Sequence, residues 1–124
     1  MNVLADTNIW CLFFRSGQST LSSLIERDFL STHLLVIGEL SVGNLPNRKQ
    51  TLLDFNAFPS VRPASFKETQ HFIENNKLYG KGLQWNDLNI LASVVASSDT
   101  LLWTEDKRLA SMAEHFDIAY TPGY

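Results

Sequence analysis

The chain has 124 residues, of which 44% are hydrophobic and 19% are charged, and its formal net charge is −3. This length predicts one domain over residues 1–124 with a single core, the composition excludes a disordered chain, and no apolar run approaches the roughly 20 residues that span a membrane. The single cysteine, Cys11, excludes an internal disulfide and a cysteine-based zinc site, and the first residues lack the layout of a signal peptide, so we expect a reducing, cytoplasmic setting.

The apolar pattern predicts short strands that alternate with helices along the chain. The expected strands are residues 2–5, 29–31, 60–62, 101–103 and 118–120. The expected helices follow Asp6, cover residues 19–27, 32–43 (with Thr32 as the N-cap), 46–57 and 106–116, and begin at Ser65 and Asp87. Because strands and helices alternate, we expect an α/β fold with three α/β/α layers around a mostly parallel sheet of about five short strands.

Four acidic residues stand at the ends or on the faces of these apolar elements: Asp6, Glu39, Asp87 and Asp106. Carboxylates beside apolar runs are costly unless they are hydrogen-bonded, paired or bound to a cation. In parallel sheets, ligands collect beyond the carboxyl ends of the strands, where Asp6 and residues 104–106 are expected to lie. Oxygen ligands without a His or Cys cluster favour Mg²⁺ or Mn²⁺. The pattern therefore predicts a metal-dependent phosphoryl-transfer or hydrolase site.

Each aspartate also has a structural explanation. Asp6, Asp87 and Asp106 could each cap a helix or stand in its first turn, at a gain of about 1 kcal/mol and with no catalytic role. Glu39 is expected in the middle of a helix among apolar neighbours, where capping does not explain it. Glu105 is interpreted as a solvated surface charge. If four clustered carboxylates were neutralised, the remaining formal charge would be +1, so the acidic balance does not exclude a nucleic-acid partner.

An aromatic stripe, Trp10, Phe13 and Phe14, recurs at helical spacing shortly after Asp6. Core packing is the default explanation, and a groove for an amphipathic partner segment is the alternative. Cys11 is interpreted as a small core residue.

The basic residues offer scattered candidates for phosphate contacts: Arg15, Arg48, Lys49, Lys81, Lys107 and Arg108. Lys107 and Arg108 are preferred because they flank the predicted acidic pocket. The three histidines are expected in surface or capping roles: His33, His71 and His115.

The segments LADTNIW, GELSVG, GKGLQWNDLNILAS and TLLWTEDKRLASMA, in this order, resemble the PIN-domain ribonucleases, and most closely the VapC-type toxins of bacterial toxin–antitoxin pairs. The resemblance covers essentially the whole chain. It implies a PIN-like fold and an endoribonuclease that hydrolyses RNA phosphodiester bonds with Mg²⁺, or with Mn²⁺. The residues that carry over from the family are the acidic quartet Asp6, Glu39, Asp87 and Asp106, with Thr104 and Asn8 as supporting groups behind the ligands. Asn89 stands where relatives often carry His.

Within this resemblance, Asp6 and Asp106 are expected to be direct metal ligands, and Asp87 a direct or water-mediated one. Glu39 is expected to be a ligand or to orient the attacking water, and Thr104 to contribute its hydroxyl group. The pattern leaves open whether one ion or two are bound.

The implied partners are an RNA substrate and a cognate antitoxin that silences the activity, and the expected assembly is a homodimer. The alternative from another class is a catalytically silent PIN-like module that binds RNA or protein. A phosphatase of the aspartyl-phosphate type ranks low, because that chemistry needs a second Asp two residues after the nucleophile, whereas Asp6 is followed by Thr7 and Asn8.

Overall fold

The computed structural model describes residues 1–17 and 19–123. Three strands form its sheet, in the order β2-β1-β3: β1 (Asn2–Ala5), β2 (Leu30–Ser31) and β3 (Thr100–Trp103). Both pairings are parallel, with Val3 opposite Leu30 on one side and Ala5 opposite Trp103 on the other. The carboxyl ends of β1 and β3 therefore meet at one edge of the sheet, where the chain continues into Asp6 and Thr104.

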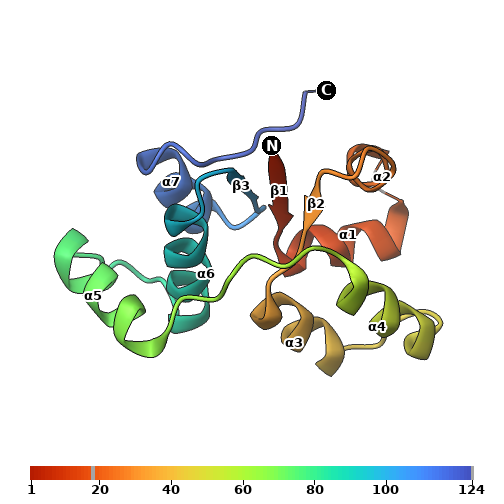
Figure 1. The fold of residues 1–124 in the computed structure, drawn as a ribbon, viewed down its shortest axis with the longest axis horizontal. Coiled ribbons are helices and arrows are strands. Elements are labelled where there is room, and N and C mark those ends of the chain that lie inside the picture. Colours follow the sequence, from red (N-terminus) through yellow and green to blue (C-terminus); the bar gives the residue numbers. More distant parts are fainter. Residues whose placement is uncertain (18, 124) are drawn as a thin grey trace.

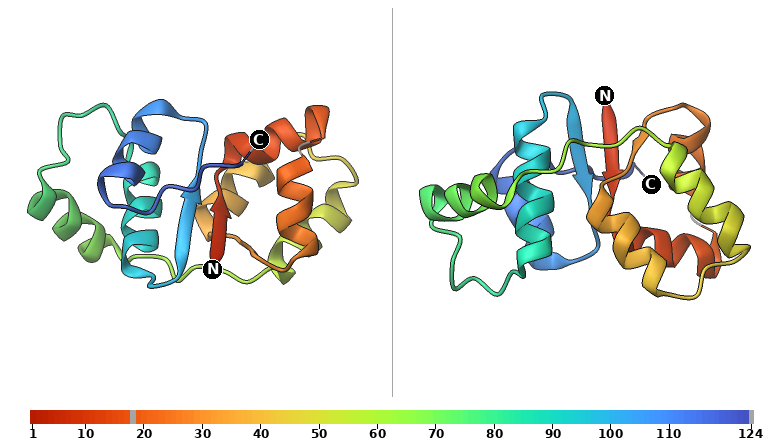
Figure 2. Two further views of the ribbon diagram at one scale, coloured as in Figure 1. Left: turned by 90° about the horizontal axis from the view of Figure 1, so that it is seen from above. Right: turned by 60° about the horizontal axis from the view of Figure 1, so that its bottom comes forward.

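Helices make up most of the remaining described chain: α1 (Thr7–Ser16), α2 (Ser19–Glu26), α3 (Leu34–Val42), α4 (Arg48–Ala57), α5 (Phe66–Asn76), α6 (Trp85–Ala96) and α7 (Lys107–His115). They gather in two groups with the strands between them (Figures 1 and 2). The first group contains α1 to α4 and the second contains α5 to α7. The predicted α/β class with a parallel sheet and helices on both sides is confirmed. None of the helices in the described ranges is both long enough and apolar enough to span a membrane.

The sheet has three strands instead of the predicted five or so. Residues 60–62 contribute a single bridge between Thr32 and Ser60, and residues 118–120 a single bridge between Leu102 and Ala119. Proline explains why neither segment extends further. Pro59 has no N–H to donate beside the first bridge, and Pro122 holds the next donor position after the hydrogen bond from Tyr120 N to Leu102 O.

Three helices begin away from their predicted starts. The N-cap of α3 is His33 in place of the predicted Thr32, α4 begins two residues after Pro46, and α6 begins at Trp85, ahead of Asp87. In each case the residue directly before the helix has an extended or left-handed backbone. His is a less common cap than Thr, so composition alone selects the wrong residue at α3.

The core lies around β1 and α6. All residues from Leu88 to Val94 are buried, as the near-continuous apolar surface predicts. Trp10 is also buried and packs against Phe55 of α4, with ring centroids 4.8 Å apart, so the core explanation is confirmed for this member of the aromatic stripe. Cys11 is exposed, and its predicted place in the core is wrong. It follows Trp10 by one residue and therefore lies on a different face of α1, where it is open to solvent.

Candidate active site

An open cavity of about 590 Å³ lies where β1 and β3 end, and four carboxylates line it: Asp6, Glu39, Asp87 and Asp106. Each carboxylate is positioned by a different helix. Asp6 and Asp106 directly precede α1 and α7, Glu39 belongs to the last turns of α3, and Asp87 stands in the first turn of α6. The fold thus brings together acids from both ends and the middle of the chain.

Asp6 is buried at the end of β1, with 6% of its surface exposed. Its Oδ1 accepts a hydrogen bond from Thr7 N at 2.8 Å and caps α1, while Oδ2 accepts one from Thr104 Oγ1 at 2.8 Å. Burial raises the pKa of Asp6, and the nearby charges of Asp87 and Glu39 raise it further, against the lowering effect of these hydrogen bonds. Asp6 is therefore a carboxylate held in a fixed orientation at an electrostatic cost.

Thr104 and Asn8 connect the first and last acids of the quartet. Thr104 Oγ1 accepts hydrogen bonds from Asp106 N at 3.1 Å and from Asn8 Nδ2 at 3.2 Å. Asn8 Oδ1 in turn accepts one from Glu105 N at 3.0 Å. These contacts join the start of α1 to the loop before α7. The two chain segments that carry Asp6 and Asp106 therefore cannot shift independently.

The structural explanation of the aspartates holds as well. Asp106 Oδ1 accepts hydrogen bonds from Arg108 N at 2.9 Å and Leu109 N at 3.0 Å, and Asp87 Oδ2 accepts one from Gln84 N at 3.4 Å. Capping occupies one oxygen of each carboxylate. The other oxygen, Oδ2 of Asp106 or Oδ1 of Asp87, accepts no hydrogen bond from the described residues. Each side chain can therefore cap its helix and still offer a lone pair to a ligand.

Asp87 is half-buried and faces two other carboxylates. Burial is the main cause that raises its pKa, and the charges of Asp106 and Glu39 add to it, while the backbone hydrogen bond from Gln84 acts in the opposite direction. Mutual repulsion of this kind links Asp87 to the other acids across the cavity.

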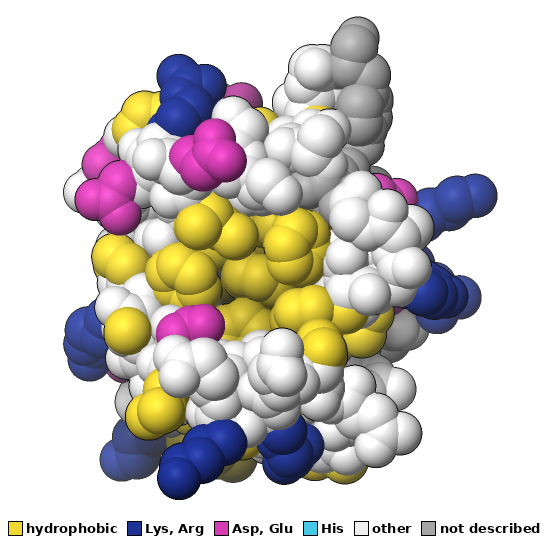
Figure 3. Space-filling view, turned by 90° about the vertical axis from the view of Figure 1, so that its right-hand side faces the viewer, with side chains coloured by type: hydrophobic (Ala, Val, Ile, Leu, Met, Phe, Trp, Pro, Cys, Tyr) yellow, Lys and Arg dark blue, Asp and Glu magenta, His cyan; other side chains and the backbone are white. Residues whose placement is uncertain are grey.

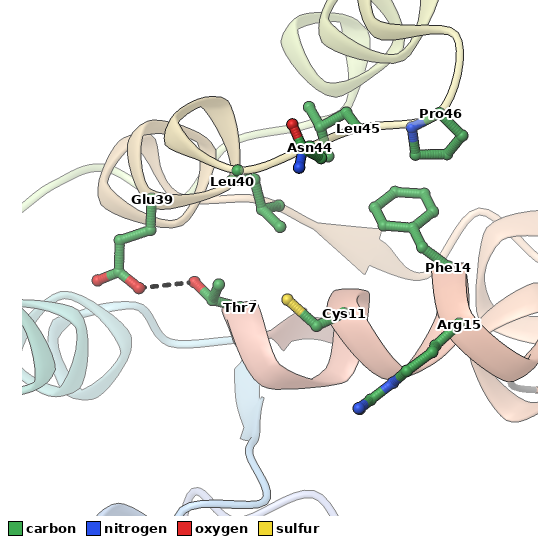
Figure 4. A pocket seen from close by; sticks show the side chains of 10 residues that line it. Thr7, Cys11, Phe14, Arg15, Glu39, Leu40, Asn44, Leu45 and Pro46 are labelled. Carbon is green, nitrogen blue, oxygen red and sulfur yellow. Dashed lines mark hydrogen bonds between the residues drawn. The ribbon is translucent and has the colours of Figure 1, made fainter.

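Glu39 is exposed, although its apolar neighbours in the sequence suggested burial. Its Oε2 accepts a hydrogen bond from Thr7 Oγ1 at 2.9 Å (Figure 4), and its Oε1 accepts one from Asn86 Nδ2 at 3.3 Å. The carboxylate thus bridges α1 and α6 from α3. The sequence reasoning missed Thr7 and Asn86, although each stands directly beside a predicted site aspartate, Asp6 or Asp87.

Two arginines stand among the acids. Arg15 and Arg108 both line the cavity, and neither forms an ion pair with a carboxylate of the described residues. Arg108 Nη1 donates to Gly82 O at 3.4 Å. Lys107, the other basic residue preferred from the sequence, lines a smaller neighbouring cavity together with Lys81.

A second, more apolar cavity of about 690 Å³ adjoins the acidic one, between α1, α3 and the loop before α4. The two cavities share Thr7, Cys11, Arg15 and Glu39. Figure 4 shows Phe14 of the aromatic stripe facing into the apolar cavity toward Leu40, Leu45 and Pro46. The face of the molecule on the α1–α4 side is hollowed and has a hydrophobic floor with charged side chains at its rim (Figure 3).

The described residues contain no three His, Cys, Asp or Glu side chains close enough to hold one metal ion as they stand. The acids share a cavity, but they do not form a closed coordination shell. The histidines do not contribute: His33 is buried beside α6, and His71 and His115 are exposed on α5 and α7.

Two curated proteins that match the chain over nearly its whole length are both named Ribonuclease VapC32. They come from Mycobacterium tuberculosis, strains CDC 1551 / Oshkosh and ATCC 25618 / H37Rv. Each is 33% identical over 121 residues, which cover 94% of this chain and 94% of the relative. No protein-family model matches the chain.

Proposed function

Because the chain belongs to the VapC-type PIN-domain ribonucleases, we propose that it is a metal-dependent endoribonuclease, a single nuclease domain whose activity a cognate antitoxin inhibits. The observation that carries this proposal is the convergence of four carboxylates on one cavity at the ends of parallel strands. The relatives' name supports RNA as the substrate. The capping bonds of Asp87 and Asp106 do not oppose the proposal, since each leaves one carboxylate oxygen without a hydrogen bond from the described residues.

The chemistry of the donor set fits Mg²⁺ or Mn²⁺, since two direct carboxylate ligands with water in the remaining positions do not need three acids in contact. Carboxylate oxygens are the ligands that these ions prefer, and a bound cation would offset the desolvation and the repulsion that raise the pKa values of Asp6 and Asp87. We assign Asp6 and Asp106 as direct ligands, Asp87 as a direct or water-mediated ligand, and Glu39 as a ligand or the group that orients the attacking water. A bound divalent ion would acidify a water molecule and offset charge on the phosphoryl oxygens.

The chain's own groups complete this arrangement. Thr104 fixes the orientation of Asp6, and Thr7 and Asn86 hold Glu39 at the cavity wall. The guanidinium groups of Arg15 and Arg108 are suited to phosphate oxygens on either side of the scissile bond, because they are planar, permanently charged and free of carboxylate partners within the described chain.

The adjacent apolar cavity is suited to the antitoxin. An apolar segment seated there would lie beside the acids, since the two cavities share four residues. A basic side chain from such a segment would pair with the carboxylates and compete with a cation for them.

The test is RNA cleavage by purified protein with Mg²⁺ or Mn²⁺, beside thermal melting. We expect Asp6→Asn, Asp87→Asn and Asp106→Asn to abolish cleavage while the protein stays folded, because Asn caps a helix nearly as well as Asp but is a poorer metal ligand. Leu91→Ala, at a fully buried position of α6, is the matched structural control and should cost about 2–5 kcal/mol of stability.

Two outcomes would change the proposal. Cleavage that survives all three Asn variants would reduce the aspartates to helix caps. RNA binding without cleavage by the wild type, at any concentration of either ion, would assign the chain to the silent binding modules.

A further inference from the structure

Two large aromatic side chains lie on the surface and stack on each other. Phe66 is 65% exposed and Trp85 is 37% exposed, yet their ring centroids are 4.7 Å apart and their planes are inclined by only 29°. Single exposed hydrophobic residues are common on protein surfaces, but a stacked aromatic pair leaves a broad flat apolar face in water. The proposed catalysis does not use this pair.

Local contacts hold the pair in place. Phe66 is the first residue of α5 and follows Ser65, which caps the helix in a reciprocal capping box with Glu68. Asn89 Nδ2 of α6 donates to Ala64 O at 2.8 Å and so ties the segment before α5 to α6. The pair is therefore a preformed surface, and a ligand that stacks on it does not have to order it first.

The pair also stands next to the acidic cavity. Trp85 is the first residue of α6, and the residues on either side of it in the sequence, Gln84 and Asn86, line the cavity together with Asp87. In Figure 1 both α5 and α6 begin at the lower edge of the molecule, toward which β1 also ends. The N-termini of two helices, which favour phosphate groups, meet at this place.

We propose that the Phe66–Trp85 pair is a stacking platform for an unpaired nucleobase of the RNA strand that occupies the acidic cavity. The proposal rests on RNA as the substrate in the proposed function. A nucleobase offers a flat π-face of matching size, and it stacks on aromatic side chains with little dependence on its sequence. In a duplex both faces of the base are covered by neighbours, so the platform selects single-stranded RNA close to the cleavage point.

Binding is measured with the Asp6→Asn variant in EDTA, so that neither cleavage nor metal affects the result. The probes are a short single-stranded RNA, the same strand with one abasic position moved along it, and the corresponding duplex. Affinity is measured for every variant by the fluorescence anisotropy of dye-labelled RNA. In proteins that keep Trp85, quenching of tryptophan fluorescence also reports on this residue, because the other two tryptophans, Trp10 and Trp103, are only 3% and 2% exposed.

We expect Trp85→Ala to weaken single-strand binding by about tenfold to hundredfold, the range for loss of one stacked base, and Trp85→Phe to restore most of it. An abasic site at one position of the strand should weaken binding to the protein that retains Trp85. The same abasic strand should bind the Trp85→Ala variant as tightly as the intact strand does. The matched control is Tyr79→Ala, which removes an aromatic ring that is 60% exposed but has no ring partner in the described chain. Its affinity should be unchanged.

Three results would overturn the platform. The first is that the proteins with and without Trp85 bind single-stranded RNA with equal affinity, and the second is that duplex and single strand bind equally well. The third is a dimer that Trp85→Ala dissociates without any loss of RNA affinity. The last would assign the pair to a contact between two copies of the chain. A failure of the nuclease proposal looks different, because the wild type would then bind single strands through Trp85 and yet leave them uncut with either metal.

Discussion

At the residue scale, Asp106 can cap a helix and still serve the proposed function. One of its oxygens accepts two backbone hydrogen bonds at the start of α7, and the other accepts none from the described residues. The capping and ligand explanations, which the sequence presents as alternatives, are therefore compatible. A helix cap orients a carboxylate at no extra cost in side-chain entropy, since the stability of the helix already requires that orientation.

Arg108 and Gly82 form the pair of residues whose coupling is simplest to test. A Cβ atom at Gly82 would lie 2.8 Å from Arg108 Nη1, so Gly82→Ala must displace the guanidinium group without removing its charge. We expect this variant to weaken RNA binding. Arg108→Gln should do so more strongly and lower the slope of log affinity against log salt by about 0.7, the value for one phosphate contact on a single strand.

Gly80→Ala is the control for backbone strain. Both glycines have a positive φ, +70° at Gly80 and +80° at Gly82, but a Cβ atom at Gly80 would meet nothing within 4 Å. If the two alanine variants lose RNA affinity equally, strain in the loop is the cause and Arg108 does not contact phosphate.

The grouping of Asp6 with Asp106 could be predicted from the sequence because both directly follow apolar strands, and parallel strands end at a common edge. The environment of Glu39 could not be predicted from the sequence. Its apolar neighbours are real, but the helix turns its carboxylate outward, toward Thr7 and Asn86. The exposure of Cys11 was missed for the same reason, since a hydrophobic stripe does not show which helical face a small residue occupies.

At the scale of single elements, α3 depends on a buried histidine. His33 Nδ1 accepts a hydrogen bond from Leu35 N at 3.0 Å and caps the helix that carries Glu39, so the neutral ring must bear its proton on Nε2, which lies 3.0 Å from Ser93 Oγ of α6. Burial lowers the pKa of His33 to about 4. The side chain is fully buried, and burial disfavours the charged imidazolium form of the ring.

This histidine predicts a pH dependence of stability. Between the folded pKa of about 4 and the unfolded value of 6.5, the unfolded chain binds more protons than the native one, so the stabilisation is complete above pH 6.5 and is lost as the pH falls toward 4. The loss is about 3.5 kcal/mol at most, because the two pKa values differ by about 2.5 units and one unit corresponds to about 1.4 kcal/mol. Urea unfolding of the wild type and His33→Asn at pH 7.5 and pH 5 measures it.

Asn at position 33 can still accept the capping hydrogen bond but does not titrate, so His33→Asn should lose less stability on acidification than the wild type. Asp6 and Asp87 have raised pKa values and therefore a slope of opposite sign, which is common to both proteins and cancels in the comparison. Equal losses in the two proteins would mean that His33 is already protonated, or solvated, in the native state.

Under the proposed function, the cavity between α1, α3 and the loop before α4 predicts which substitutions in this chain weaken the binding of an antitoxin. Leu45 is half-buried and lines this cavity, so Leu45→Asp should weaken antitoxin binding more than tenfold by placing a charge under an apolar segment. Leu53→Asp is the matched control, because Leu53 is 58% exposed on α4 and lines neither cavity. Titration calorimetry with the purified antitoxin compares them, and equal affinities would place the partner elsewhere.

The helices and the three paired strands were largely predictable from periodicity and caps, whereas the extent of the sheet beyond those strands was not. The strands of this protein are two to four residues long, and whether a segment such as 60–62 or 118–120 extends into a ladder depends on prolines and on a partner far away in the sequence. The buried face of α6 was visible because an uninterrupted apolar run leaves no alternative to burial.

At the scale of the whole molecule, the metal-free protein carries repulsion that a cation should remove. We expect Mn²⁺ to raise the melting temperature of the wild type, with a gain of about 2.7 kcal/mol at a hundredfold excess over its dissociation constant. Asp87→Asn should be at least as stable as the wild type without metal, because it removes a partly buried charge whose pKa burial and neighbouring acids raise. It should also gain less from Mn²⁺.

Melting curves of both proteins with and without Mn²⁺ decide the matter, and Ca²⁺-free buffer with EDTA defines the metal-free state. An identical Mn²⁺ effect on wild type and Asp87→Asn would place the ion outside the acidic cavity. A large loss of stability in metal-free Asp87→Asn would mean that the hydrogen bond to Gln84 outweighs the repulsion.

The order of the strands sets when the acidic cavity can assemble during synthesis of the chain. β1 is made before both of the strands that flank it, β2 and β3. Asp6 therefore meets Thr104, which follows it by 98 residues, only after β3 has left the ribosome. Under the proposed function, a nascent or truncated chain that ends before Asp106 has no assembled site and cannot cut the messenger RNA that encodes it.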